Sequence, residues 1–218
     1  MKNNAVQQHG IDFENLIHHA WHGISKSEYE KKIPGGYTSK WDIMEGIHSD
    51  SNVSVKVTKS DGIGFGDILR LYKATKEEPF TLVVGCFFQK SKTIKSYYEI
   101  LEIYFEPKYH KLLWGGITLK EIESFVDYVK NISPGKESQS INQKIWKEKR
   151  EDMYKKRGLI SIDAKIDSKT QRRVQCGVKL KELMSSSIKF ARYDKNYRDK
   201  IDLPYFQYNT PVRSFNFK

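Results

Sequence analysis

Polar and apolar residues alternate between Val53 and Lys59, where the chain reads Val-Ser-Val-Lys-Val-Thr-Lys. A two-residue period of this kind predicts a strand with its valines on one face and Ser54, Lys56 and Thr58 on the other. A lysine in the middle of a strand with one strictly apolar face is unusual unless its ammonium group has a task. Lys56 is therefore the first candidate functional residue.

A second short strand is predicted at residues 41–44, because residues 48–52 after it have the composition of a turn. The two strands would then form a hairpin. A register that pairs Asp42 with Thr58 places Asp42 and Lys56 on one face as diagonal neighbours. We predict this register, or a bulge with the same result, so that a carboxylate faces the lysine.

A helical period is found at residues 12–25, where Asp12 can cap the helix and Glu14 lies on the flank of the apolar stripe. Glu14 either interacts favourably with the helix dipole or points from the edge of the stripe into a site. His18 and His22 are one turn apart, but no carboxylate at matching spacing accompanies them. We therefore interpret the histidines as a polar helix flank and not as metal ligands.

The remaining elements follow from the same periodicities and from turn residues. The glycine-rich segment 60–66 matches neither a dinucleotide fingerprint nor a P-loop, and we predict a flexible loop there that enters a helix at Asp67. No repeat or clean linker divides the chain, so we predict one α/β domain over residues 1–218. Further strands are predicted at residues 80–88, 97–105, 159–167 and 173–180, and further helices at 119–132 and 140–157.

The excess of basic residues limits the classes of partner that the protein is expected to bind. The chain has 38 lysine and arginine residues against 27 acidic ones, a net charge of +11, which favours nucleic acid first and an anionic membrane second. No apolar run is long enough to span a bilayer, and residues 1–10 lack the apolar core of a signal peptide. Cys86 and Cys176 lack zinc-ligand spacing. We expect them to be buried thiols of a cytoplasmic protein that does not act at a membrane.

Asp42 and Lys56 match the chemistry of phosphodiester hydrolysis. That reaction uses a divalent metal ion, and Mg²⁺ binds carboxylate and carbonyl oxygens. A nearby lysine orients the attacking water and offsets developing negative charge. The alternative is structural, with Lys56 as a residue that protects an edge strand from aggregation and Asp42 bound to a turn.

These residues resemble the PD-(D/E)XK nuclease superfamily, which includes the type II restriction endonucleases. The resemblance covers the N-terminal third: Glu14 on a helix, Asp42 on one strand, and Ser54-Val55-Lys56 on the next. The family usually has an acid where this chain has Ser54. Some restriction enzymes show the same Ser-x-Lys variant and take the missing acid from the following helix, where Asp67 stands. The order of elements also resembles the family's αβββαβ core.

The resemblance implies a restriction-endonuclease-like core, with a central mixed β-sheet flanked by helices, and cleavage of double-stranded DNA at specific sites. Asp42 and Asp67 would bind Mg²⁺, Lys56 would orient the water, and Glu14 would assist. A palindromic site would favour a homodimer, because protein symmetry then matches DNA symmetry. The alternatives are another nuclease of this fold, for repair, junction resolution or phage mobility, and a non-catalytic basic nucleic-acid-binding protein.

Sequence recognition requires a second set of residues, which we expect in segment 140–218, beyond a catalytic core mainly in 10–132. A two-stranded ribbon fits the major groove, where basic and amide side chains read base edges. The alternative is a basic hairpin that holds the DNA backbone non-specifically. A second polar and aromatic candidate is residues 192–198. The candidate DNA-binding residues are Ser54, Thr58, Lys59, Lys165, Ser168, Lys169, Gln171, Arg172, Arg173 and Gln175.

Overall fold

A computed structural model describes residues 4–23, 25–33, 41–46, 51–89, 95–133, 136–166, 171–194, 209–210 and 213–214. The chain divides into two compact units. The first contains Met1–Asp61, Pro79–Phe105 and Ile188–Lys218, and the second contains Gly62–Glu78 and Glu106–Ser187. The units interleave along the sequence, so neither coincides with the predicted core 10–132 or with segment 140–218. A single nuclease domain stays a prediction.

The first unit is built on a four-stranded mixed sheet in the order β1-β3-β4-β7. β1 (Val53–Thr58) is parallel to β3 (Phe80–Gln89), whereas β4 (Lys95–Phe105) and β7 (Lys189–Asp194) continue the sheet in antiparallel fashion. Both faces of β3 are buried, as its continuous apolar sequence predicts. The predicted α/β class with a mixed sheet flanked by helices is confirmed.

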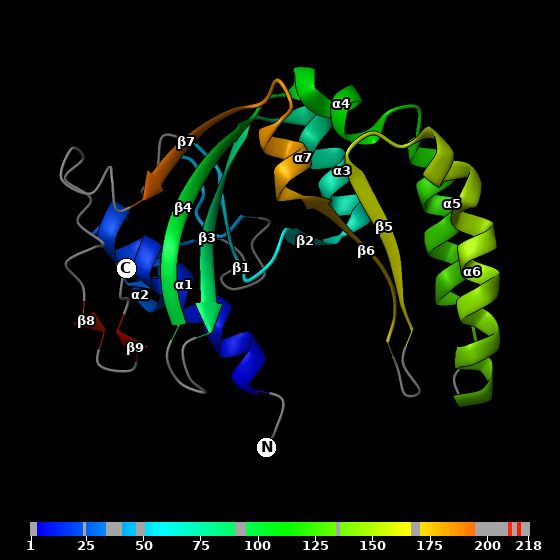
Figure 1. Cartoon of the computed structure of the whole chain (residues 1–218), viewed down its shortest axis with the longest axis horizontal. Helices are drawn as coiled ribbons and strands as arrows, with labels where there is room; N and C mark the ends of the chain where they lie inside the picture. The colour runs from blue at the N-terminus through cyan, green and yellow to red at the C-terminus, as the bar shows by residue number, and fades with distance from the viewer. Residues whose placement is uncertain are drawn as a thin grey trace. The chain divides into compact units, whose positions relative to one another are not determined.

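Helix α1 (Asn4–His22) lies along this sheet, and a short helix α2 (Lys26–Lys32) follows it (Figure 1). The helical stripe of α1 packs against the valine face of β1, which explains why both elements form. α1 begins well before Asp12, so the predicted cap at that residue is wrong. The core between helix and sheet contains Phe13, Leu16, Ile17, Tyr29, Val53, Val55, Val83, Phe87, Tyr97 and Ile100.

The predicted hairpin forms only as a single antiparallel bridge between Ile43 and Val53. The predicted register, with Asp42 opposite Thr58, is therefore wrong, but its expected result is confirmed, because Lys56 Nζ lies 3.1 Å from Asp42 Oδ2. β1 instead pairs along its length with β3, in parallel. A parallel partner lies in a distant part of the chain, so no local sequence pattern predicts it. The bridge leaves Asp42 beside the outer edge of β1.

The second unit contains a three-stranded antiparallel sheet in the order β2-β6-β5. The predicted loop at 60–66 is wrong, because Gly62–Asp67 forms β2 against β6. Pairing with β6 stabilises this strand despite the low strand propensity of its glycines. The other elements of this unit are α3 (Ile68–Glu77), η2 (Pro107–Tyr109), α4 (His110–Trp114), α5 (Leu119–Lys130), α6 (Lys136–Lys156), β5 (Ile160–Ile166), β6 (Arg172–Lys179) and α7 (Leu180–Met184).

Helices cover one face of this second sheet. α3 and α5 pack on β6 and α6 packs on β5, and α5 and α6 run alongside the β5–β6 hairpin in Figure 1. Val174, Cys176 and Val178 of β6 are buried, as alternation predicts for a half-buried strand. The predicted helix at 119–132 is confirmed, and Thr118 caps it through a capping box with Glu121.

Cys86 and Cys176 are free and buried, as expected. Within the described ranges, no helix has both the length and the apolar character needed to cross a membrane. A two-residue strand β8 (Asn209–Thr210) pairs with β9 (Arg213–Ser214).

Candidate active site on the edge strand of the first unit

Asp42 and Lys56 lie together in the first unit. Lys56 Nζ is 3.1 Å from Asp42 Oδ2, and the two side chains are 27% and 28% exposed. The pair is therefore partly shielded from water yet open to a ligand. Lys56 Nζ also donates to the main-chain oxygen of Val55, at 2.9 Å.

The Asp42 carboxylate also occupies the outer edge of β1. Its Oδ2 accepts hydrogen bonds from Val55 N at 2.6 Å and from Ser54 Oγ at 3.2 Å, in addition to the bond from Lys56. All of these donors reach the same oxygen, and none of these bonds involves Oδ1. Ser54, at the position where the nuclease pattern has an acid, binds the first carboxylate and adds no second charge.

Glu14 of α1 interacts electrostatically with this pair. Burial first, and then the negative charge of Asp42, raise the pKa of Glu14, whereas Lys26 and Lys56 act against that shift. Lys26 Nζ lies 2.6 Å from Glu14 Oε2 and holds this side chain in place. We refer to Glu14, Lys26, Asp42 and Lys56 as the acid–lysine cluster.

Helix α2 contacts both segments that carry these acids. Besides Lys26, it contributes Tyr29, whose buried hydroxyl accepts a hydrogen bond from Met44 N, two residues after Asp42. Burial and the charge of Asp42 raise the pKa of Tyr29. Sequence reasoning missed α2, although Ser25 and Glu28 have the spacing of the capping box that begins it.

His18 corrects the predicted polar flank of α1. Its side chain is fully buried and its ring packs at a tilt against Tyr29, with centroids 4.7 Å apart. Its Nε2 lies 4.0 Å from Glu14 Oε1. His18 is therefore a core residue that lies next to Glu14.

Asp67 belongs to the second unit, where it is exposed and caps α3. Its Oδ1 accepts a hydrogen bond from Arg70 N at 2.8 Å. The structure thus gives Asp67 the helix-capping role that its position at the start of α3 allows. Its pairing with Asp42 on a metal ion stays a prediction.

The two other strand residues proposed to contact DNA differ in exposure. Thr58 is 5% exposed, and its hydroxyl donates to Ser60 O at 2.8 Å and accepts from Ser60 N at 3.2 Å. This geometry favours a structural turn over a phosphate contact. Lys59 is exposed and open to a polyanion.

The predicted recognition residues divide along the β5–β6 hairpin. Lys165 and Arg173 are exposed and lie directly opposite each other. Arg172 instead bonds to main-chain oxygens, with Nε 2.9 Å from Ile132 O, which favours a structural role. Gln171 is exposed and Gln175 half-buried, while Ser168 and Lys169 lie outside the described residues.

The second polar and aromatic candidate is described only in part. Arg192 of β7 forms an ion pair with Glu99, with Nε 2.7 Å from Oε1, so this guanidinium already has an acidic partner. The side chain of Tyr193 and the whole of Asn196, Tyr197 and Arg198 lie outside the described residues.

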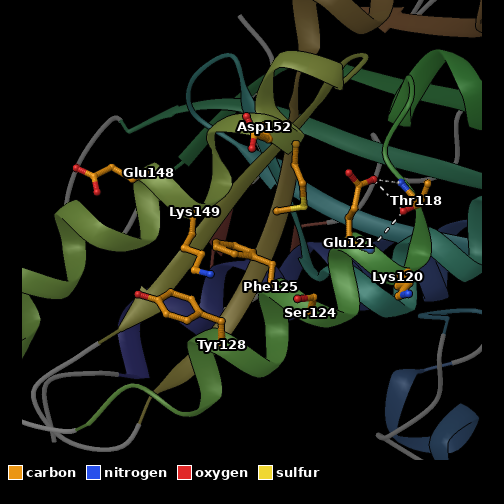
Figure 2. A pocket seen from close by; sticks show the side chains of 10 residues that line it. Thr118, Lys120, Glu121, Ser124, Phe125, Tyr128, Glu148, Lys149 and Asp152 are labelled. Atoms are coloured by element: carbon orange, nitrogen blue, oxygen red, sulfur yellow. Dashed lines mark hydrogen bonds between the residues drawn. The ribbon is translucent and has the colours of Figure 1, made fainter.

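A groove of about 770 Å³ lies between α5 and α6 in the second unit and contains none of the predicted site residues. Figure 2 shows Glu121 at its rim, bonded to Thr118, with Tyr128 and Lys149 on the opposite side. Lys156 binds Glu121 at 2.6 Å and, with Thr118, lowers the pKa of Glu121 to about 2. The groove is lined by both basic and acidic side chains. Glu121, its acid at the rim, is already bonded to Thr118 and Lys156.

Within the described part of the chain, no group of three or more His, Cys, Asp or Glu side chains has the geometry of a metal site. Comparison with family models, with curated proteins and with solved structures gives no match.

Proposed function

We propose that this protein is a magnesium-dependent, sequence-specific DNA endonuclease with a restriction-endonuclease-like core. The observation that carries the proposal is the contact between Asp42 and Lys56, with Glu14 near enough for the charges to interact. The proposed chemistry is that of the PD-(D/E)XK nucleases, which the sequence resembles, and the proposed site is the acid–lysine cluster of the first unit. The net charge of +11 suits a polyanionic substrate.

The donor atoms of the site suit a hard cation. Asp42 Oδ1 and the main-chain oxygen of Val55 are the oxygen types that Mg²⁺ binds, and Mg²⁺ usually keeps several of its waters. Glu14, held by Lys26, is suited to bind one of those waters. Asp67 remains the proposed second carboxylate. When bound, the metal ion would lower the pKa of water and polarise the scissile phosphate.

Each residue of the cluster then has a definable task. The Lys56 ammonium group sits between Asp42 Oδ2 and Val55 O, so it is fixed in direction. There it would orient the attacking water and offset the negative charge that develops on the phosphate. The bonds from Ser54 and the Val55 amide hold the Asp42 carboxylate through Oδ2, and Oδ1 would be the oxygen that binds the metal ion.

Lys56→Ala tests the proposal, with Lys32→Ala as the matched control. Lys32 is an exposed lysine of α2 in the same unit, so both variants lose one positive charge. Cleavage of intact plasmid DNA with Mg²⁺ should fall by about 10²-fold or more in Lys56→Ala, while Lys32→Ala should cut like wild type. DNA binding, measured without metal, should remain in both.

The products distinguish the related functions. Discrete fragments from intact, unmodified duplex support a restriction enzyme, and mapping of their ends identifies the site. Cleavage confined to damaged or branched DNA supports a repair or junction nuclease of the same fold. Asp42 has a structural contact to Val55 N, so a binding protein is the second candidate, and wild type that binds DNA but never cuts it with Mg²⁺ would establish that reading. We also propose a homodimer, because a palindromic site would match its symmetry. Analytical ultracentrifugation of the protein with a duplex that contains the cleavage site would measure this oligomeric state.

A further inference from the structure

The β5–β6 hairpin places two cations side by side. Lys165 and Arg173 are directly opposite in the antiparallel register, so their side chains project from the same face of the second sheet. Both are exposed. Like charges at directly opposed positions destabilise a sheet, because side chains at such positions lie about 5 Å apart.

Among the described residues, no carboxylate forms an ion pair with Lys165 or Arg173. Asp163 on the same face binds Arg150, with its Oδ1 3.0 Å from Nη1, and Asp67 caps α3. Among the described residues, the two cations therefore lie side by side without an acidic partner of their own. An anion bound between them would remove the repulsion and gain two charge-assisted hydrogen bonds.

The face around this pair is polar. Gly64 of β2 is paired with Gly177 of β6, so these two positions add no side chain to the face, which also carries Ser161, Asp163 and Gln175. Space above Gly64 is open, since an added Cβ would meet no atom within 4 Å. Lys179 is exposed at the far end of β6, where it binds Glu182 at 3.2 Å. A polar face with two adjacent exposed cations suits a polyanion.

Other polyanionic partners fit this face less well. Membrane surfaces are bound through inserted apolar side chains or through larger clusters of basic residues, and single-stranded nucleic acid through stacking on aromatic rings. The large hydrophobic residues that are exposed in the described part of the chain are Ile11, Phe88, Tyr98, Tyr104 and Phe190. All of them belong to the first unit and none to the second sheet.

We propose that this open face of the β2-β6-β5 sheet binds the backbone of duplex DNA, with Lys165 and Arg173 contacting adjacent phosphates. The inference rests on the proposed endonuclease function and identifies how its substrate is held. It narrows the role of the hairpin: these two residues position the duplex and do not read its sequence. Arg172, held by main-chain oxygens, takes no part.

The test compares two double variants of the full-length protein. Lys165→Gln with Arg173→Gln removes the cation pair, and Lys111→Gln with Lys130→Gln removes the same charge from exposed helix positions of the same unit. Fluorescence anisotropy measures binding to duplexes of unrelated sequence, in EDTA, over a range of salt. Each lost phosphate contact costs about 5-fold in affinity at 0.15 M salt and lowers the salt slope by about 1.

We expect the Lys165/Arg173 variant to bind every duplex about 30-fold more weakly than wild type, with a slope smaller by about 2. Its thermal midpoint at low salt should be unchanged or higher, because the repulsion is gone. The same slope in this variant and wild type, or an equal loss in the Lys111/Lys130 variant, would overturn the inference. Cleavage is scored separately: wild type that binds through this face but cuts nothing with Mg²⁺ would refute the endonuclease and leave the binding surface standing.

Discussion

Replacement of Asp42 separates its structural bonds from its proposed catalytic one. Asparagine keeps an oxygen that can accept from Val55 N and Ser54 Oγ, whereas alanine leaves the Val55 amide without its side-chain partner. A hydrogen bond to a charged group contributes about 1.5–3 kcal/mol and one between neutral groups about 0.5–1.5. Because the carboxylate is 28% exposed, we expect Asp42→Asn to lose about 1–2 kcal/mol of unfolding free energy and Asp42→Ala about 2–4 kcal/mol.

Activity should follow a different order from stability. Both variants lack the charged oxygen that would bind metal, so both should lose about 10³-fold or more in Mg²⁺-dependent cleavage. Urea denaturation gives the free energies, and plasmid cleavage at saturating Mg²⁺ gives the rates. Folded Asp42→Asn that cuts within about 10-fold of wild type would refute the proposed metal role. Equal destabilisation by the two substitutions would instead refute the importance of the bonds to Oδ2.

Three further changes test the surroundings of the site. Because the pKa of Glu14 is raised, the folded state holds this proton above pH 4.5 and stability falls as pH rises through the interval up to the raised pKa. Glu14→Gln should therefore unfold at higher urea than wild type at pH 7 but not at pH 4, and a less stable variant at pH 7 would contradict this. An added Cβ at Gly85 would lie 2.6 Å from the Phe13 ring. Gly85→Ala should thus lose about 1–3 kcal/mol and slow cleavage by displacing α1, whereas Gly10→Ala, in open space on the same helix, should lose neither. Thr118→Ala removes the α5 cap and should cost about 1 kcal/mol in thermal unfolding without any change in cleavage.

Local sequence patterns were enough to predict the helix that contains Glu14 and the strand that contains Lys56. The alternation around Lys56 determined which face of β1 it occupies, because side chains of a strand project alternately whatever its partner. The apolar stripe of the first helix likewise placed Glu14 at the margin of a buried face. The β5–β6 hairpin could be predicted for the same reason, since its strands are adjacent in sequence and both alternate.

Only the tertiary structure decided how these elements pair and which of their side chains meet. β1 pairs with β3 across a long separation in sequence, and β2 forms from a glycine-rich segment because β6 is there to bind it. α2 contacts both acid-bearing segments through Lys26 and Tyr29. The periodicity of a segment reports its own burial, whereas strand pairing and side-chain contacts depend on segments far along the chain. The sequence by itself therefore determined the faces on which Lys56 and Glu14 lie. The fold alone decided that His18 and Thr58 are buried and that Asp42 binds both an edge amide and Lys56.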